Sequence, residues 1–356
     1  MLRQSRKLDH IVHAINLRNI SESESLFDDV RLLHDCLPEL NFDDISLTDK
    51  LFGKDINAPI MINALTGGSV DVAVYNEKLA FLAKELQIPI AVGSQYAALE
   101  NTSVAYTFEI VRNINPDGIV IANLGAHATV NEAQAAVNMI SADALQIHIN
   151  PAQELIMSEG DRNFKGYLEN IKRIKEFINV PIIVKETGCG ISSDSLEKIL
   201  ALGISNVDVS GLGGTNFLEI ENMRKNDVLQ KDLIKWGIPT VVSIISASLK
   251  LKNKDLLVAS GGITTPMHVA KSLALGADIA GMSMYFLDLV TRYPDLTEAI
   301  KEFEKFTKEL KVIMLLTGSE SVHNLRSKRV HLSLSLCNWL DTYDINYKDI
   351  VRQRRC

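Results

Sequence analysis

The sequence predicts a closed (β/α)₈ barrel (TIM barrel) of the α/β class, with an N-terminal extension and C-terminal helices. Eight short apolar runs lie between residues 58 and 290, and each ends in small or polar residues. Segments with helical periodicity separate the runs, and alternating strands and helices predict a parallel sheet. About eight such units close into a barrel whose strand C-termini share one face. We therefore expect the polar residues that follow the runs to converge on one site.

The expected strands are short and rich in β-branched residues. They are Pro59–Ala64, Ile88–Gly93, Gly118–Ala122, Ala144–Ile149, Pro181–Val184, Val207–Val209, Leu256–Ala259 and Ile279–Gly281. The expected helices between them are Val74–Leu86, Glu132–Ile140, Gly166–Ile178, Ser193–Leu202 and Pro266–Leu275. Several of these helices end at a glycine or proline just before the next strand, which is typical of αβ loops.

The flanking segments complete one domain over residues 1–356. Residues 1–57 form an extension that is expected to close over the site, 58–290 the barrel, and 291–356 a helical region. Within that region, Leu296–Thr317 has the pattern of an amphipathic helix, which offers a surface for a homo-oligomer, a tetramer or an octamer. The unit from Gly211 to Lys254 is longer than the others, and such insertions after a strand usually form active-site loops or lids.

Composition excludes several classes of protein. A length of 356 residues is enough for a barrel of about 250 residues with additions. The net charge of −7 argues against a nucleic-acid partner, because phosphate backbones select basic surfaces. Four separated cysteines without a C-x-x-C pair argue against a zinc site or a disulfide framework. No apolar stretch approaches the roughly 20 residues that span a bilayer, and no signal peptide is evident, so we expect a cytoplasmic protein without membrane contact.

The ends of the seventh and eighth strands carry glycine motifs. Ser260-Gly261-Gly262 ends the seventh strand, and Gly281-Met282-Ser283 ends the eighth. In barrels these two loops commonly bind a phosphate through backbone N–H groups, and glycine lets the backbone approach the anion. A tight turn without a ligand is the alternative, but glycines at both strand ends favour phosphate binding.

Lys185 follows the apolar residues Ile182–Val184 and should point into the mouth of the barrel. It could be a Schiff-base nucleophile, a partner for an anion, or half of an ion pair with Glu186. The adjacent Glu186 should point the other way, because side chains alternate along a strand. The residues alone leave the three possibilities open.

The segment from His148 to Glu154 contains several groups suited to a ligand site. His148 and Asn150 share one side of a strand, and Gln153 and Glu154 follow in the loop. A lone carboxylate with neutral polar neighbours suits Mg²⁺, which keeps waters and takes substrate phosphate oxygens as ligands. A hydrogen-bonded core histidine and a solvated glutamate are the alternatives. No second acidic ligand is evident, so protein groups alone would not hold the metal tightly.

Seven motifs together resemble the type 2 isopentenyl-diphosphate isomerases, from about residue 6 to about residue 325. They are Arg6-Lys7-x-x-His10, Ala64-Leu65-Thr66-Gly67-Gly68, Gly93-Ser94-Gln95, His148-Ile149-Asn150-x-x-Gln153-Glu154, Val184-Lys185-Glu186, Gly213-Gly214-Thr215 and Ser260-Gly261-Gly262. The first and the fourth are specific, whereas the glycine motifs are shared with many FMN barrels.

The resemblance implies a barrel that holds FMN and interconverts isopentenyl and dimethylallyl diphosphate with Mg²⁺, after NADPH has reduced the flavin to its active form. It implies flavin ring and ribityl contacts from Ala64, Leu65, Thr66, Ser94, Asn123, Lys185, Ser210 and Thr215, and phosphate contacts from Gly261, Gly262, Met282 and Ser283. It implies substrate contacts from Arg6, Lys7, His10, Ser94, Gln95, His148, Asn150 and Gln153. Glu154 would bind Mg²⁺, and Gln153 and Lys185 would be the catalytic residues.

Two positions depart from the family pattern. Tyr96 stands where an arginine often follows Ser-Gln, so one cationic contact to the diphosphate is missing or replaced. Leu65 stands where methionine is common, which conserves volume.

The implied reaction protonates an unactivated alkene, and a glutamine amide is a poor acid–base group near neutral pH. We therefore expect reduced FMN to supply the proton from N5, with Lys185 holding the N1–C2=O end of the flavin. The alternative enzyme is an FMN-dependent 2-hydroxy acid or dihydroorotate-type oxidoreductase. That chemistry uses an arginine for the substrate carboxylate, and no arginine follows a strand here. A catalytically silent flavin-binding barrel is a third possibility.

Overall fold

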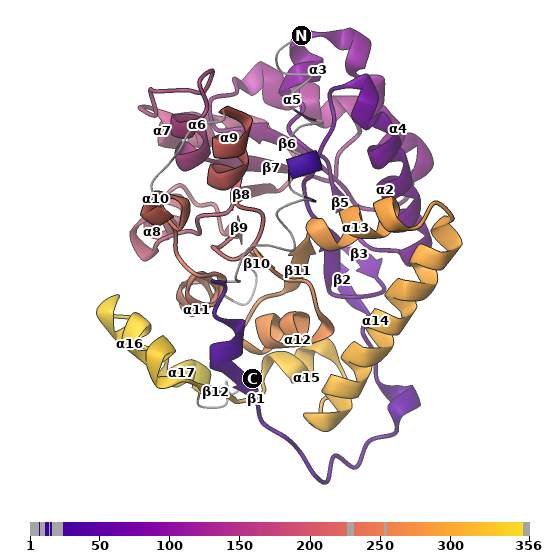
Figure 1. Cartoon of the computed structure of the whole chain (residues 1–356), viewed down its shortest axis with the longest axis vertical. Helices are drawn as coiled ribbons and strands as arrows, with labels where there is room; N and C mark the ends of the chain where they lie inside the picture. Colours follow the sequence, from indigo (N-terminus) through magenta and orange to yellow (C-terminus); the bar gives the residue numbers. More distant parts are fainter. Residues whose placement is uncertain are drawn as a thin grey trace.

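A computed structural model describes residues 7, 11–13, 15, 24–225, 231–252 and 255–351. Two residues that the sequence placed at the substrate, Arg6 and His10, lie outside this range. The centre of the molecule is a closed parallel barrel in the order β10-β11-β4-β5-β6-β7-β8-β9, which confirms the predicted fold class (Figure 1).

The barrel strands coincide with the predicted apolar runs. They are β4 (Ile60–Ile62), β5 (Ile90–Ala91), β6 (Val120–Gly125), β7 (Ala144–Ile149), β8 (Ile182–Glu186), β9 (Asn206–Asp208), β10 (Leu256–Ser260) and β11 (Ile279–Met282). The register places His148 beside Lys185, and Lys185 beside Asp208, on adjacent strands. Polar side chains far apart in the sequence therefore meet at one level of the barrel.

Helices surround the strands (Figure 1). The main ones are α2 (Ala73–Leu86), α4 (Tyr106–Ile114), α5 (Val130–Met139), α7 (Tyr167–Phe177), α8 (Ser193–Ala201), α11 (Thr240–Lys250), α12 (Pro266–Ala274) and α13 (Met284–Arg292). The five predicted helices are all present, with ends within two residues of the prediction. Helices α4, α11 and α13 were not predicted; α11 is buried nearly all round and has no polar face to mark its period.

The barrel interior has an apolar lower layer and a polar upper layer. The lower layer consists of Met61, Ala91, Ile121, Ala144, Ile183, Leu256, Val258 and Ile279, covered from below by Leu51 and Ile56. These two residues belong to a hairpin of β2 (Asp49–Leu51) and β3 (Lys54–Ile56). Two positions further along five of the strands, on the same face, stand Asn63, Asn123, Gln146, Lys185 and Ser260. The period of two thus places a polar layer directly beneath the mouth of the barrel.

Shorter elements complete the chain. The helical turns are η1 (Phe27–Asp29), η2 (Phe42–Asp44), η3 (Val70–Val72), α3 (Tyr96–Glu100), η4 (Thr102–Val104), α6 (Pro151–Ile156), α9 (Phe217–Lys225) and α10 (Lys231–Ile234). The C-terminal region contains α14 (Leu296–Leu316), α15 (Val322–Arg326), α16 (Leu334–Thr342) and α17 (Lys348–Val351). The predicted amphipathic helix is confirmed as α14, which packs along α12 and α2. None of the described helices combines the length and apolar character needed to cross a membrane.

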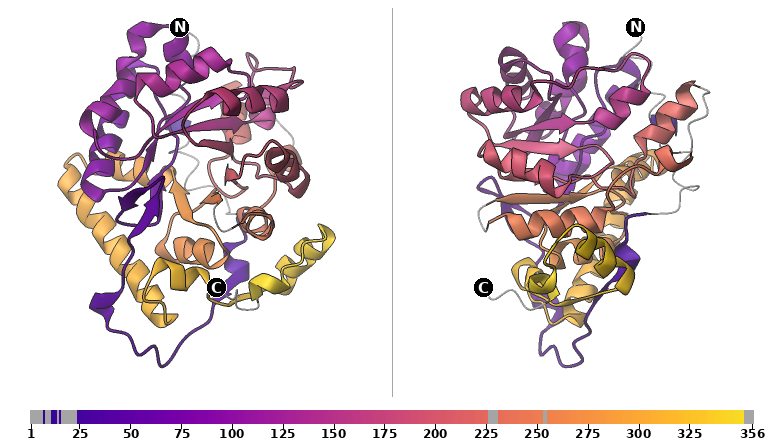
Figure 2. Two further views of the ribbon diagram at one scale, coloured as in Figure 1. Left: turned by 180° about the vertical axis from the view of Figure 1, so that it is seen from behind. Right: turned by 90° about the vertical axis from the view of Figure 1, so that its left-hand side faces the viewer.

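The N-terminal extension is attached to the C-terminal region. Strand β1 (Val30–Leu32) pairs antiparallel with β12 (Val330–Leu332), near the place where α16 and α17 project from the body (Figures 1 and 2). Lys271 Nζ on α12 donates to the carbonyl of Phe27 at 2.9 Å, and the Phe27 ring stacks on His268 with centroids 4.6 Å apart. This strand pair was not predicted from the sequence.

Candidate active site

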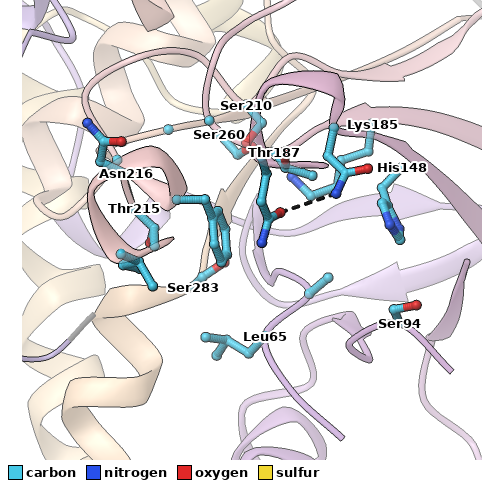
Figure 3. Close-up of a pocket in the computed structure, with 18 of the residues that line it drawn as sticks. Leu65, Ser94, His148, Lys185, Thr187, Ser210, Thr215, Asn216, Ser260 and Ser283 are labelled. Carbon is cyan, nitrogen blue, oxygen red and sulfur yellow. Dashed lines mark hydrogen bonds between the residues drawn. The ribbon is translucent and has the colours of Figure 1, made fainter. Parts of the chain in front are cut away.

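A cavity of about 520 Å³ opens at the C-terminal ends of the barrel strands (Figure 3). It brings together most of the residues that the resemblance implied. Those that line it are Lys7, Ala64, Leu65, Ser94, Asn123, His148, Asn150, Gln153, Glu154, Lys185, Ser210, Thr215, Gly261, Gly262 and Ser283. Residues from scattered strand ends therefore line one cavity, as the barrel fold predicted.

Among the predicted site residues that the structure describes, three do not line the cavity. Met282 and Thr66 are buried beside it. Gln95 is fully buried, and its amide is engaged with backbone groups: Nε2 donates to the Ala136 carbonyl and Oε1 accepts the Asn123 N–H, each at 3.0 Å. The structure therefore does not place the Gln95 side chain at the substrate. Instead it ties the loop after β5 to β6 and α5.

Lys185 forms a buried ion pair with Asp208, not with Glu186. The distance from Lys185 Nζ to Asp208 Oδ2 is 3.1 Å, and Asp208 is fully buried. Asp208 also accepts hydrogen bonds from Asn63 Nδ2 at 2.6 Å and from the Ser260 hydroxyl. This residue was missed by the sequence analysis, although an aspartate within the apolar run Val207–Val209 was a usable signal. The pair holds the Lys185 ammonium at the floor of the cavity.

Glu186 points away from the cavity, as its position in the strand predicted. Its Oε2 accepts the backbone N–H groups of Thr187 and Gly188 at 2.6 Å and of Cys189 at 2.5 Å, and so shapes the loop after β8. Burial raises the pKa of Glu186 to about 7, although these N–H groups and Lys185 oppose the rise. Burial and the nearby Glu186 also raise the pKa of the Cys189 thiol to about 12, so Cys189 is not a thiolate nucleophile.

The raised pKa of Glu186 predicts a specific pH dependence of stability. The folded protein binds this proton more tightly than the unfolded chain, so the contribution is complete below about pH 4.5 and is lost as the pH rises to about 7. We expect Glu186→Gln to remove that loss. Relative to the wild type, the variant should gain up to about 3 kcal/mol between pH 4 and pH 8. Denaturant unfolding of both proteins across this range measures the difference, and a constant difference would contradict the assignment.

His148 is the polar side chain nearest the top of β7. Its Nδ1 lies 2.8 Å from Asn123 Oδ1. Burial, together with the electrostatic effect of His127, Lys7 and Lys185, lowers the pKa of His148 to about 3. In the absence of an anion the imidazole is therefore neutral at physiological pH.

Gln153 and Glu154 are held by neighbours on the same wall. Asn150 Nδ2 donates to Gln153 Oε1 at 3.2 Å and to Glu154 Oε1 at 3.0 Å. Gln153 Nε2 in turn points to Glu221 Oε1 at 3.4 Å, and Glu221 is fully buried and paired with Arg224. The Gln153 amide is therefore fixed at both ends. The sequence analysis missed Glu221, which lies on α9 in the long insertion; its spacing of three residues from Arg224 on a helix was the available signal.

Four carboxylates, Glu154, Glu159, Asp161 and Glu219, are among the described residues that line the cavity. Among the described residues there is no group of three His, Cys, Asp or Glu side chains that could hold a metal ion. The Glu154 carboxylate accepts the Asp161 N–H at 2.9 Å on Oε2 and keeps further lone pairs. This donor set fits Mg²⁺ that takes most of its ligands from water and a bound phosphate.

The glycine loops form a cradle of backbone. A Cβ on Gly261 would lie 2.3 Å from the Gly211 carbonyl oxygen, and a Cβ on Gly262 would lie equally close to the Gly213 oxygen. Both residues have positive φ, which favours glycine. The neighbouring α12 is capped by Thr265, whose hydroxyl accepts the His268 N–H at 3.1 Å. Gly261 and Gly262 also line the cavity, and a lining of backbone beside a helix N-terminus fits the phosphate of a flavin nucleotide.

A second observation also fits a flavin. The Thr66 hydroxyl is buried beside the cavity and finds no hydrogen-bond partner within the described part of the chain. Its neighbour Leu65 lines the cavity, on the side opposite Lys185 and His148 (Figure 3). Ser210, with φ of 36°, is held in a strained conformation that is typical of functional sites.

Part of the N-terminal extension reaches the cavity. Lys7 and Ile11 line it, together with Tyr96, which stands where the family often has arginine. The Tyr96 ring packs edgewise on His127, with centroids 5.0 Å apart. An aromatic pair thus occupies the position of the missing cation, while Lys7 supplies positive charge nearby.

The fold and the cavity define the class of FMN-dependent barrels. Residues 111–332 match the family of FMN-dependent dehydrogenases. The fold resembles flavocytochrome b2 (TM-score 0.66, 15% identity, 89% of this chain and 80% of that chain) and mandelate oxidase (0.63, 14%, 88% and 93%).

Within this class, the sequence relatives are more specific. An isopentenyl-diphosphate delta-isomerase of Staphylococcus saprophyticus is 40% identical over 95% of this chain and 96% of its own. That of Listeria monocytogenes serotype 4a is 38% identical over 99% and 98%. The chain belongs to the isopentenyl-diphosphate delta-isomerase family.

Proposed function

We propose that the protein interconverts isopentenyl and dimethylallyl diphosphate, by a 1,3-allylic proton shift that uses reduced FMN and Mg²⁺, with NADPH as the reductant. The observation that carries this proposal is that one cavity holds both the flavin-type floor around Lys185 and the wall of His148, Asn150, Gln153 and Glu154. The curated relatives bear the name of this reaction.

Each group has a distinct task in this proposal. Gly261, Gly262 and Ser283 would hold the flavin phosphate, and Lys185 would hold the polar edge of the flavin ring. When bound, reduced FMN supplies the acid–base and electrostatic chemistry that no lining side chain provides. The Lys185 ammonium, ion-paired with Asp208, would stabilise negative charge at the floor of the cavity.

The protein wall would orient the substrate. Lys7, Ser94, His148 and Asn150 line the part of the cavity where the diphosphate is expected, and Glu154 would bind Mg²⁺ that bridges to it. Gln153, held by Asn150 and Glu221, would present its amide to the allylic carbons. A fixed amide can guide a proton through an oriented hydrogen bond, even though it does not titrate near neutral pH.

The alternative oxidoreductase is less well supported. The likeness to mandelate oxidase and flavocytochrome b2 supports only a shared fold, because their sequence identity to this chain is below 16%. A 2-hydroxy acid needs a partner for its carboxylate, and arginine is absent from the described residues that line the cavity. The isomerase is therefore the function that the lining favours.

The test is an anaerobic assay of the full chain with isopentenyl diphosphate, FMN, Mg²⁺ and NADPH, in which each component is omitted in turn. We expect dimethylallyl diphosphate only when Mg²⁺ and reduced flavin are present, with far less NADPH consumed than product formed. Bound flavin without product would overturn the proposal in favour of a silent barrel. Flavin reduction by lactate or mandelate would overturn it in favour of the oxidoreductase.

We further propose that the part of the 1–57 extension that contains Lys7 and Ile11 closes over the cavity when diphosphate binds, and that the protein is a cytoplasmic homo-oligomer, a tetramer or an octamer. Lys7 and Ile11 at the cavity support closure, and Leu334, 85% exposed on the projecting α16, supports association. Proteolysis of the extension at the same rate with and without diphosphate would contradict closure. Sedimentation analysis measures the assembly, and a monomer would contradict it.

A further inference from the structure

A row of hydrogen-bonded side chains crosses the polar layer beneath the cavity. It runs from Asp208 through Asn63, Gln146 and Asn123 to His148. The donor–acceptor distances along it are 2.6, 3.1, 3.2 and 2.8 Å. The four members before His148 are each at most 3% exposed, so water does not compete for these bonds.

The orientation of the Asn63 amide is fixed at two points. The Asp208 carboxylate is ion-paired with Lys185 and can only accept, so the Asn63 nitrogen must face it. On the other side, the backbone N–H of Ala64 donates to Asn63 Oδ1 at 2.9 Å, so this atom must be oxygen. Asn63 therefore presents an acceptor to Gln146.

This polarity passes along the row. Because Asn63 Oδ1 accepts, Gln146 donates through Nε2 and presents Oε1 to Asn123. Asn123 then donates through Nδ2 and presents Oδ1 to His148. An acceptor facing Nδ1 requires a proton on that nitrogen. The strand register supports this order of donors and acceptors, since Asn123 and Gln146 are direct neighbours on β6 and β7.

We propose that Gln146 is a positioning residue that fixes the tautomer of His148, with the proton on Nδ1 and the Nε2 lone pair available to a ligand in the cavity. His148 lines the cavity, whereas Gln146 does not, so Gln146 acts only through its neighbours. No described residue forms a hydrogen bond with Nε2.

The fixed tautomer has a consequence that rests on the proposed function. Nδ1 keeps its proton whether the ring is neutral or cationic, so any proton gained must go to Nε2. A diphosphate oxygen that approaches Nε2 then forms a hydrogen bond to it through a single proton. That proton comes either from the substrate or from water. The positive charges of Lys7 and Lys185, which act on His148, would also stabilise the diphosphate anion that meets this proton.

The tautomer is measured by solid-state ¹⁵N NMR of the FMN-loaded full chain labelled at histidine. The His148 signals are identified by their loss in His148→Gln. We expect a protonated Nδ1 and an unprotonated Nε2 near neutral pH. A neutral His148 with its proton on Nε2 would overturn the proposal. This readout is independent of isomerase activity, so failure of the proposed function does not change it.

Two variants test the part played by Gln146. Gln146→Met keeps the length of the side chain but removes both hydrogen bonds, so we expect a mixture of His148 tautomers. Gln146→Glu keeps an oxygen facing Asn123 whether or not the carboxyl group is protonated, so the Nδ1–H signature should persist. An unmixed Nδ1–H signature in Gln146→Met would overturn the role of Gln146. If that variant fails to fold, loss of the signature in Gln146→Glu would overturn it instead.

In the isomerase assay, Gln146→Met should raise KM for isopentenyl diphosphate about tenfold at equal flavin content, which is the size of one lost hydrogen bond. Gln146→Glu should recover most of that loss. A purely structural role would change KM by the same factor in both variants. Equal KM values in the two variants would therefore overturn the positioning role.

Discussion

Lys185→Met is expected to destabilise the protein and to abolish most of its turnover. The substitution removes the ammonium and leaves the Asp208 carboxylate fully buried without its counter-ion. Breaking a buried ion pair in this way costs about 3–5 kcal/mol. The flavin would also lose the cation at its polar edge, so we expect reduced FMN retention and at least about a 100-fold fall in kcat. Denaturant unfolding, flavin absorbance after gel filtration, and the isomerase assay measure the three effects.

A second substitution separates stability from function at this site. Asp208→Asn in the Lys185→Met background removes the unpaired charge and keeps hydrogen-bonding groups for Asn63 and Ser260. We expect the double variant to recover most of the lost stability but not the activity. Wild-type turnover in either variant would exclude a role for Lys185 at the flavin. Recovery of both properties would show that Lys185 serves only to neutralise Asp208.

Gln153→Met is expected to lower kcat by about 100-fold or more while FMN binding is unchanged. The amide is held between Asn150 and Glu221, and methionine keeps its length without its hydrogen bonds. Positioned proton-transfer groups contribute about 10²–10⁴-fold in rate. Single-turnover isomerisation with saturating substrate measures the chemical step.

Leu155→Ala is the matched control for Gln153→Met. Leu155 lies on the same short helix, α6, but is 51% exposed and does not line the cavity. We expect its kcat to stay within about twofold of the wild type, as is usual for surface substitutions. A Gln153→Met enzyme with normal kcat and raised KM would assign Gln153 to binding alone.

The barrel and most of its mouth could be predicted from the sequence because both follow from local patterns. An apolar run predicts a strand wherever it occurs, and the C-termini of parallel strands share one face. Lys185, His148 and Asn150 were therefore found without knowledge of their neighbours. Val207–Val209 was also predicted as a strand. The partner of Asp208, however, depends on the register between neighbouring strands, which no local sequence pattern determines.

Other features depend on directions that the chain sets only after folding. Gln95 follows a strand end, yet it lies in a loop where the period of two no longer determines where a side chain points, and it turns towards α5. Glu221 reaches Gln153 from the long insertion, whose path over the barrel is set by packing. Strands β1 and β12 are three residues each and too short to carry a recognisable alternation.

The pairing of β1 with β12 also orders events during synthesis. Val30 has left the ribosome long before its partner Leu332 is made, so the strand pair cannot form until the chain is almost complete. The barrel strands and the glycine cradle all precede residue 290 and can assemble earlier. Strand β1 therefore pairs with its partner only after all eight barrel strands have been made.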